Sequence, residues 1–263
     1  MASDYFEEAD KLLKKGHYGE AIKQYEAGLR IDPKDIDGLY NMAEALIELK
    51  RYQEAIFAYD KIIKLRPSDY DAWMNKSWVL LELERYEESL IASENAIRID
   101  PQIDSGWINK SCALLELEDY KGAMAAADKA IEVEPEGIDG WVNKSDALLN
   151  LELYSDAKKA AEKALEFDPE DKDALVNLAE ALFSLGDKEK TLEIIENTIK
   201  LDEKDAETWY YKARFLSRMN MVEEAISTLT IACSLEPKLK EEAGEEDDFE
   251  NLSTSEKFKK LIK

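Results

Sequence analysis

The apolar and polar residues of this chain follow a helical spacing that is interrupted by short turns. Trp73, Ser77 and Leu80 fall at i, i+4 and i+7, which places them on one stripe of an α-helix. A second stripe of the same kind follows a turn and stops before Pro101, whose ring has no N–H with which to continue a helix. Residues 70–103 are therefore predicted to form a hairpin of two helices.

This hairpin pattern recurs every 34 residues. The six prolines keep the interval, with one gap of twice the length, at Pro33, Pro67, Pro101, Pro135, Pro169 and Pro237. Four of the five tryptophans share another place in the pattern, at Trp73, Trp107, Trp141 and Trp209. Self-similarity at a fixed interval of this length indicates stacked supersecondary units. We therefore predict one all-α array of seven units, at residues 2–35, 36–69, 70–103, 104–137, 138–171, 172–205 and 206–239.

Small residues recur at two places of the unit, where places are counted from the first residue and proline stands at place 32. Place 8 holds Ala9, Ala43, Ser77, Ser111, Ser145, Ala179 and Ala213. Place 20 holds Ala21, Ala55, Ser89, Ala123, Ala157, Thr191 and Ala225. Because the distance between packed helices depends on the side chains at the contact, these places are predicted to be where the two helices of each hairpin cross.

The order of an aromatic residue, a small residue, a leucine, Tyr-x-x-Ala, alanine and proline resembles the tetratricopeptide repeat family over residues 2–239. The resemblance implies a right-handed α-solenoid, or superhelix, with a concave groove that binds other proteins. The turn glycine of the family is kept as Gly16 and Gly186. Four other units carry a larger residue there, which costs about 1 kcal/mol if its backbone is left-handed. These residues are Lys50, Glu84, Glu118 and Glu152.

A second departure from the family is lysine at place 7, where an apolar residue is usual. The lysines are Lys76, Lys110, Lys144 and Lys212. We expect their stems to pack between hairpins while the ammonium groups reach water or acid. The expected partners of the first three are Glu48, Glu82 and Glu116.

The two ends of the array differ from its middle. In unit one, the stripe that would face a preceding unit is charged throughout, at Asp4, Glu8, Lys11 and Lys15. We predict that this stripe is a solvated cap, as repeat arrays require, and that Met42 and Leu49 of unit two are buried against unit one.

Residues 240–263 are predicted to be an acidic linker and a C-terminal capping helix. Ser253 and Glu256 form the sequence of a capping box, and the helix would turn Phe258, Leu261 and Ile262 inward. The acidic run before it is expected to be solvated, without a further role. A flexible tail that binds a partner is the alternative.

The charge of the chain limits the classes of molecule that it is expected to bind. There are 59 acidic and 35 basic residues, for a formal net charge of -24. Such a field repels phosphate backbones and anionic membranes, so neither nucleic acid nor a membrane is expected as a partner. Basic proteins or peptides are favoured, and the alternative is that the acid serves solubility alone.

No reaction chemistry is apparent in the sequence. Its one histidine, His17, lies in a predicted surface turn, and no nucleophile–base pair, phosphate loop or metal-ligand spacing occurs. Cys112 and Cys233 lie in different units and predict neither a disulfide nor zinc. No signal-like or membrane-spanning run is present. We expect a cytoplasmic protein that is not an enzyme and has no cofactor or metal.

One periodic feature points to binding. Place 6 is asparagine in five successive units, at Asn41, Asn75, Asn109, Asn143 and Asn177. In relatives such as the O-linked N-acetylglucosamine transferases, a comparable ladder holds an extended peptide, and a primary amide both donates and accepts as a peptide does. The resemblance therefore implies exposed amides in the groove. The alternative is that these asparagines bond within the scaffold.

Acidic and apolar residues accompany the ladder in the predicted groove. The acidic ones are Glu44, Glu48, Glu82, Glu116, Asp146 and Glu180. The apolar and aromatic ones are Tyr40, Met74, Trp78, Ile108 and Tyr210. Co-chaperones of this family clamp acidic tails with groove lysines and an arginine, and this chain lacks that set.

Two functions remain open at this point. The first is an adaptor, expected to be a monomer rather than a homo-oligomer, that binds an extended basic or neutral segment of another protein in the groove. The second is a self-assembling scaffold in which the groove has no dedicated role. The sequence does not name the partner.

Overall fold

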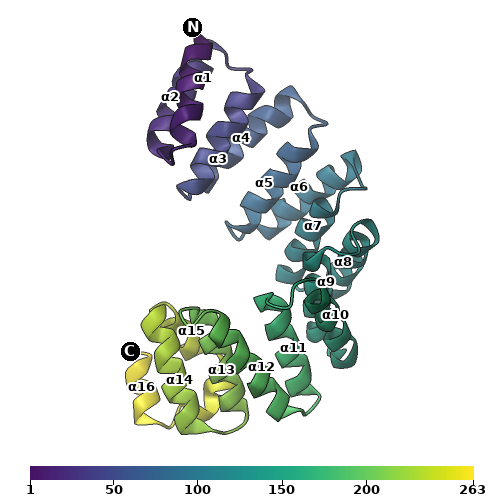
Figure 1. The fold of residues 1–263 in the computed structure, drawn as a ribbon, viewed down its shortest axis with the longest axis vertical. Helices are drawn as coiled ribbons and strands as arrows, with labels where there is room; N and C mark the ends of the chain where they lie inside the picture. Colours follow the sequence, from purple (N-terminus) through teal and green to yellow (C-terminus); the bar gives the residue numbers. More distant parts are fainter. The chain divides into compact units, whose positions relative to one another are not determined.

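The computed structural model describes residues 1–263 and is helical throughout, without strands. Fourteen helices run in succession as α1 (Ala2–Leu13), α2 (Tyr18–Ile31), α3 (Ile36–Glu48), α4 (Tyr52–Leu65), α5 (Tyr70–Leu81), α6 (Tyr86–Ile99), α7 (Asp104–Glu116), α8 (Tyr120–Val133), α9 (Ile138–Asn150), α10 (Tyr154–Phe167), α11 (Lys172–Ser184), α12 (Lys188–Leu201), α13 (Ala206–Arg218) and α14 (Val222–Leu235). Three short elements follow, namely α15 (Leu239–Glu245), the 3-10 helix η1 (Asp247–Leu252) and α16 (Glu256–Leu261). The predicted all-α fold is confirmed (Figure 1).

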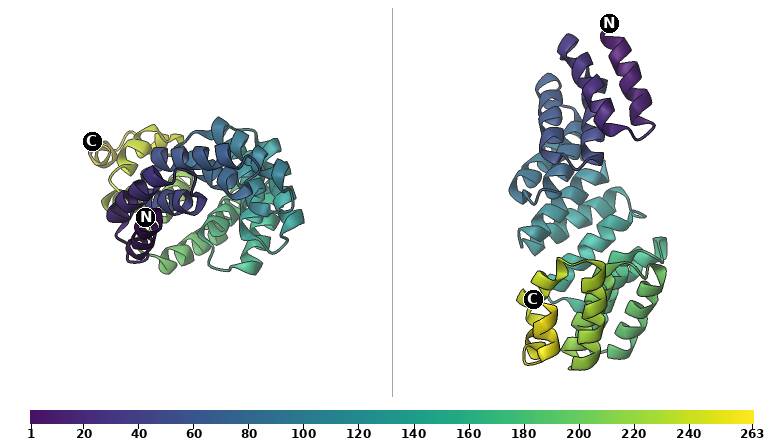
Figure 2. Two further views of the ribbon diagram at one scale, coloured as in Figure 1. Left: turned by 90° about the horizontal axis from the view of Figure 1, so that it is seen from above. Right: turned by 90° about the vertical axis from the view of Figure 1, so that its left-hand side faces the viewer.

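The chain divides into two compact units, Met1–Asn143 and Lys144–Lys263, with the division inside α9. We call them unit N and unit C and describe each by itself. In unit N, every helix from α1 to α8 packs against the next in sequence. In unit C, the same order holds from α10 to α14, and the C-terminal elements pack on α13 and α14 (Figure 2). Sequential packing of helix pairs is the arrangement of an α-solenoid.

The small residues lie where the two helices of a hairpin cross. Ala9, Ala21, Ser77 and Ser89 are all 0% exposed. Hydroxyl groups at these places also bond across the hairpin, since Ser89 Oγ donates to the Ser77 carbonyl at 2.8 Å. Three further pairs repeat this bond, namely Ser111 to Ala123, Ser145 to Ala157 and Thr191 to Ala179. The crossing is therefore both tight and hydrogen-bonded.

The periodic tryptophans fasten the connection between hairpins. The indole N–H of Trp73 donates to the carbonyl of Pro67 at 3.0 Å. Trp107 and Trp141 bond the carbonyls of Pro101 and Pro135 at the same distance. Trp209 bonds the carbonyl of Glu203, where proline is absent, so the bond needs only the loop carbonyl. Each of these tryptophans therefore stands six residues after the loop carbonyl that it bonds.

Three place-7 lysines bond the preceding hairpin, as expected, but the acidic partners of Lys76 and Lys110 were predicted wrongly. Lys76 Nζ lies 2.6 Å from Asp60 Oδ1, and Lys110 Nζ lies 2.8 Å from Glu94 Oε1. Lys212 pairs with Glu196 at 2.9 Å. Each partner is on the second helix of the preceding hairpin, because place 7 faces that helix and the predicted glutamates lie at the end of the first.

The two termini are closed differently. Asp4, Glu8, Lys11 and Lys15 are exposed, as predicted for an N-terminal cap. Met42 is buried, but Leu49 is 42% exposed, contrary to the prediction. It follows the last residue of α3 and lies beyond the helix contact.

At the C-terminus, Leu239, Ala243, Phe249, Leu252 and Phe258 join the core of the last hairpin. The predicted capping box was wrong, because α16 begins later, at Glu256, with Ser255 at its N-cap. The acidic run was also interpreted wrongly. Part of it folds as α15 and η1, and the carboxylates of Glu246 and Asp248 bond arginines, as described below.

The turn inside each hairpin has a left-handed residue. Its φ is +57° at Glu84, +59° at Glu118 and +74° at Gly16. Lys50, Glu152, Gly186 and Asn220 share this backbone. The expected left-handed strain at the glutamates is therefore present.

We expect Glu118→Gly to raise the unfolding free energy by about 0.5–1 kcal/mol, since glycine adopts this backbone without a Cβ clash. Ala125→Gly, at an exposed position of α8 in the same hairpin, is the control and should lower it by about 1 kcal/mol. Urea unfolding followed by circular dichroism measures both. A loss of stability in Glu118→Gly would contradict the argument.

Candidate functional site

The most informative cavity of unit N lies on the first helices of its hairpins. It has a volume of about 440 Å³. Its walls come from α5, the start of α6, α7 and the start of α9, at Trp78, Leu81, Glu82, Tyr86, Ile108, Asn109, Cys112, Glu116 and Asp139. We call it the Trp78 pocket. It brings together five residues predicted for the site, namely Trp78, Ile108, Asn109, Glu82 and Glu116.

Trp78 is the main apolar surface of this pocket. Trp78 is 38% exposed. Tyr52 supports it edge-on, with ring centroids 6.4 Å apart and an interplanar angle of 86°. The Tyr52 hydroxyl in turn donates to Glu82 Oε2 at 3.2 Å. The indole is thus held in place beside a carboxylate.

The glutamates at place 13 have structural partners that the sequence interpretation missed. Tyr52 bonds Glu82, and the same pairing of a tyrosine with a glutamate 30 residues later joins Tyr86 to Glu116. Loss of water and then the charge of the paired glutamate raise the pKa of both hydroxyls. The tyrosines therefore remain donors at neutral pH. The paired tyrosines and glutamates both recur at the 34-residue interval, and this shared spacing could have predicted the pairs.

The asparagine ladder was predicted to be exposed, and for two members this is wrong. Asn109 is 7% exposed and donates to Ser77 Oγ at 2.8 Å and to the Met74 carbonyl at 3.2 Å. Asn143 is 9% exposed and donates to the Ile108 carbonyl at 3.4 Å. Both amides reach the first helix of the preceding hairpin, because place 6 borders that helix.

The other ladder members differ from one another. Asn41 donates to Asp10 Oδ1 at 3.0 Å, an atom that also accepts the Tyr25 hydroxyl at 2.7 Å. Asn75 is half-buried on α5. Asn177 lines a cavity of unit C. The alternative, that these amides bond within the scaffold, accounts for Asn41, Asn109 and Asn143.

Two predicted aromatic residues also belong to the scaffold. The Tyr40 hydroxyl donates to Asp69 Oδ1 at 2.5 Å, and its ring meets Tyr59 edge-on. Burial, followed by Asp69, raises the pKa of Tyr40 far above its ordinary value. Tyr210 is 9% exposed because Phe249 covers it, with ring centroids 5.4 Å apart. Tyr210 is therefore covered, contrary to the prediction, whereas Tyr40 is half-buried with its hydroxyl bonded to Asp69.

The remaining predicted residues of unit N are at the surface. Glu44 and Glu48 are exposed on α3, and Met74 is half-buried on α5. Glu48 is paired to Tyr18, whose pKa it raises by accepting its hydroxyl. We call the surface formed by Asp37, Glu44, Glu48, Asp71, Trp78, Glu82 and Glu116 the first-helix face of unit N.

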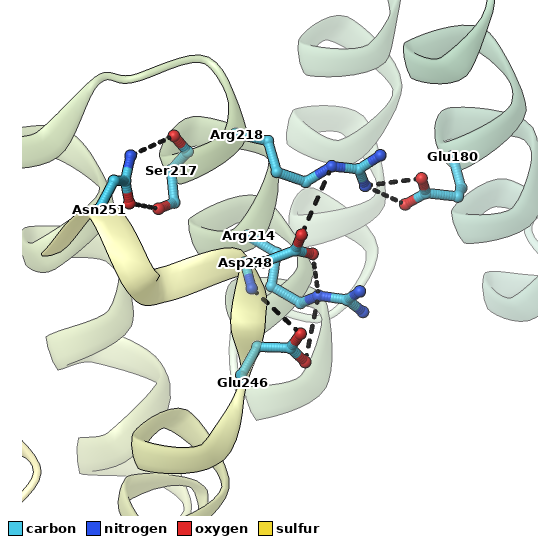
Figure 3. A network of polar contacts seen from close by, with 7 residues as sticks. All are labelled: Glu180, Arg214, Ser217, Arg218, Glu246, Asp248 and Asn251. Atoms are coloured by element: carbon cyan, nitrogen blue, oxygen red, sulfur yellow. Dashed lines mark hydrogen bonds and ion pairs between the residues drawn. The ribbon is translucent and has the colours of Figure 1, made fainter. Parts of the chain in front are cut away.

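Unit C presents a different first-helix surface. A cavity of about 330 Å³ there includes the predicted residues Asp146, Asn177 and Glu180, together with Tyr211, Arg214 and Arg218. The two arginines were not predicted as site residues. Arg218 Nη1 donates to both carboxylate oxygens of Glu180, at 2.6 and 2.8 Å (Figure 3).

The C-terminal segment completes the charge network of unit C. Arg214 Nε donates to Asp248 Oδ2 at 2.8 Å and lies 3.5 Å from Glu246 Oε2. Asn251 bonds the Ser217 carbonyl at 2.8 Å beside it (Figure 3). Arg214 and Asp248, like Ser217 and Asn251, are 34 residues apart, which is the repeat interval, but Asp248 and Asn251 lie outside the seven predicted units. The cationic groups of this surface are compensated within the chain.

Two general properties complete the description. No group of three or more His, Cys, Asp or Glu side chains is arranged to hold a metal ion. None of the helices combines the length and the apolar character needed to cross a membrane.

Comparison with known families agrees with this architecture. The pattern described as "Tetratricopeptide repeat" matches residues 12–64, 40–102 and 105–136. The pattern described as "Anaphase-promoting complex, cyclosome, subunit 3" matches residues 150–231. No curated protein matches.

Solved structures show the same fold. A tetratricopeptide repeat protein from Parabacteroides merdae ATCC 43184 covers 99% of this chain and 97% of its own, with a TM-score of 0.79 and 16% identity. MamA from Desulfovibrio magneticus RS-1 covers 65% of this chain and 96% of its own, with a TM-score of 0.60 and 25% identity. YrrB covers 72% and 97%, with a TM-score of 0.54 and 21% identity.

The hairpin array and its periodic contacts define a helical-repeat scaffold. The chain is a tetratricopeptide repeat protein.

We expect Asn109→Ala to lower the unfolding free energy by about 1–3 kcal/mol, because it leaves buried polar groups of the preceding hairpin without their donor. Asn75→Ala is the control, and should change it by no more than about 0.5 kcal/mol. Thermal and urea unfolding measure both. Equal, negligible effects would show that the Asn109 bonds do not stabilise the stack.

We expect Asp248→Asn to lower the stability of unit C by about 1–2 kcal/mol, because Arg214 loses a charged acceptor. Asp247→Asn, at the exposed neighbouring position, should be neutral. Hydrogen exchange of α13 and η1 reports the local effect. If exchange in η1 is unchanged, the ion pair is not what holds this segment.

Proposed function

We propose that this chain is a non-enzymatic, monomeric adaptor of the cytoplasm, in which the first-helix face of unit N binds an extended, basic or neutral segment of a partner protein. The proposal includes the division into seven tandem units over residues 2–239 and a C-terminal cap over 240–263. Its support comes from charge, exposure and cavity geometry.

The observation that carries the proposal is a set of exposed carboxylates without neutralising basic residues on the same helices. The only basic residues in α3, α5 and α7 are Lys76 and Lys110. Both are held at the preceding second helix by Asp60 and Glu94. The exposed carboxylates of the first-helix face therefore have no cation of their own on these helices. Such a surface attracts and orients a basic ligand.

A second observation in support is the apolar surface of Trp78, which is exposed among these carboxylates. Trp78 is 38% exposed in a pocket next to Glu82 and Glu116. Aromatic residues in pockets are the commonest anchors of protein interfaces. YrrB, a protein of the same fold, is described as having an unusual peptide-binding site. The proposal that unit N binds a peptide rests on the residues of unit N itself.

The test uses a library of capped twelve-residue peptides of net charge near +4, zero and -4 with the full chain. We expect the basic peptides to bind, and their affinity to fall as salt rises from about 50 to 500 mM, because exposed charges are screened over about 8–10 Å at physiological ionic strength. Fluorescence anisotropy measures this. Equal or better binding of the acidic peptides would contradict the proposal.

A charge-matched pair of variants localises the binding. Changing Glu44, Glu82 and Glu116 to glutamine should weaken the basic peptides and flatten the salt dependence. The control changes Glu20, Glu87 and Glu136 to glutamine, which removes the same charge from exposed positions elsewhere in unit N. Equal losses in both variants would mean that net charge alone attracts the peptides.

A self-assembling scaffold is the second candidate. Phe57 is 60% and Ile91 59% exposed at the same place of successive second helices, which offers an apolar surface outside the first-helix face. Light scattering over a concentration series separates the two functions, since the adaptor stays monomeric.

A further inference from the structure

Trp78 does not make the bond to a loop carbonyl that the other four tryptophans make. Those four donate their indole N–H to a loop carbonyl at 3.0 Å. Trp78 stands instead at place 9, on the pocket side of α5, with 38% of its side chain exposed. Its ring is held by Tyr52 at a centroid distance of 6.4 Å. A rigid, partly exposed aromatic ring with no scaffold bond is a ready surface for a ligand.

The groups around this ring select a cation. Glu82 and Glu116 line the same pocket as Trp78 and Tyr86. Glu82 accepts one tyrosine hydroxyl at 3.2 Å, and a carboxylate has about four acceptor sites. Acceptor capacity therefore remains beside the aromatic surface. A π face and a carboxylate together favour a positively charged group.

Unit C contains the same combination with its cation already in place. The guanidinium carbon of Arg218 lies 4.1 Å from the centroid of the Phe183 ring. The same guanidinium donates to both oxygens of Glu180 at 2.6 and 2.8 Å. Arg218 is at place 13 of its 34-residue repeat, and Glu116 stands at the same place three repeats earlier. In unit N, Glu116 stands where unit C has its arginine, while the aromatic ring and another carboxylate of the pocket come from different places of the repeat, at Trp78 (place 9) and Glu82 (place 13).

We propose that the Trp78 pocket receives the side chain of an arginine from a partner protein, which stacks on the Trp78 indole and bonds Glu82 and Glu116. The inference rests on the proposed function and names the residue that this site recognises. Arginine suits the site better than lysine because its planar guanidinium stacks on aromatic faces, forks to carboxylates and is less strongly hydrated. The cavity of about 440 Å³ has room for one such side chain.

The probes are capped nine-residue peptides with four arginines separated by glycine and serine, and counterparts in which lysine or citrulline replaces every arginine. Citrulline keeps the shape of arginine but has no charge. With the full chain, we expect the arginine peptide to bind at least about tenfold more tightly than the citrulline peptide, and several-fold more tightly than the lysine peptide. In NMR spectra, the Trp78 indole signal should shift, while those of the other four tryptophans stay in place.

Two variants, each with a matched control, test the pocket itself. Trp78→Ala should weaken the arginine peptide about tenfold, whereas Phe57→Ala, which removes an exposed aromatic ring outside the pocket, should leave it unchanged. Glu116→Arg should block the peptide by supplying the cation from within the chain, as Arg218 does. Glu87→Arg makes the same charge change at an exposed position of α6 and should weaken binding far less. Circular dichroism verifies that each variant is folded.

The outcomes separate the two proposals. Citrulline and arginine peptides of equal affinity, or a Trp78 signal that does not move, overturn the arginine site. If Trp78→Ala binds normally while the Glu44, Glu82 and Glu116 variant is weakened, the adaptor function stands and the arginine site fails. If none of the probes binds at concentrations up to about 1 mM, the arginine site also fails.

Discussion

The close crossing of two helices is the constraint on which the rest of this structure depends. Only alanine, serine or threonine stands at places 8 and 20, and those at the crossing are fully buried. A larger side chain would separate the backbones, and the cross-hairpin hydroxyl bonds, such as that of Ser89 to Ser77 at 2.8 Å, would be lost. Because the crossing fixes each hairpin, the tryptophan bond to the loop carbonyl can set the next hairpin at the same interval.

The sequence predicted the features that depend on neighbours within one or two hairpins. Helix periodicity, the buried small residues and the left-handed turns at Glu84 and Glu118 were all predictable, since each has a local cause. The N-terminal charged stripe was predictable for the same reason. What local patterns could not supply was the choice among several acids within reach of a long side chain, so that Lys76 bonds Asp60 rather than the expected Glu48.

The candidate site was predicted less well than the fold. The amide of Asn109 was placed on the correct helix, but its burial depends on the crossing distance to α5, which sequence alone does not give. Arg214 and Asp248 are 34 residues apart, which is the repeat interval, but Asp248 lies beyond the seventh predicted unit, in a 3-10 helix that the hairpin pattern did not predict. By contrast, the pocket residues Trp78, Ile108 and Glu82 were predicted together, because the repeat places them on adjoining first helices.

The contrast between the two units argues that the acid on unit N is more than a device for solubility. Solubility needs charge that is spread over the surface, and it is satisfied by carboxylates anywhere on the chain. In unit C, Glu180 of the first-helix surface is held by Arg218, and Arg214 holds Asp248 of η1. In unit N, the same surface keeps its carboxylates without a cation, and they gather around an exposed tryptophan that solubility would disfavour. A ligand that brings both apolar stem and positive charge satisfies both groups at once.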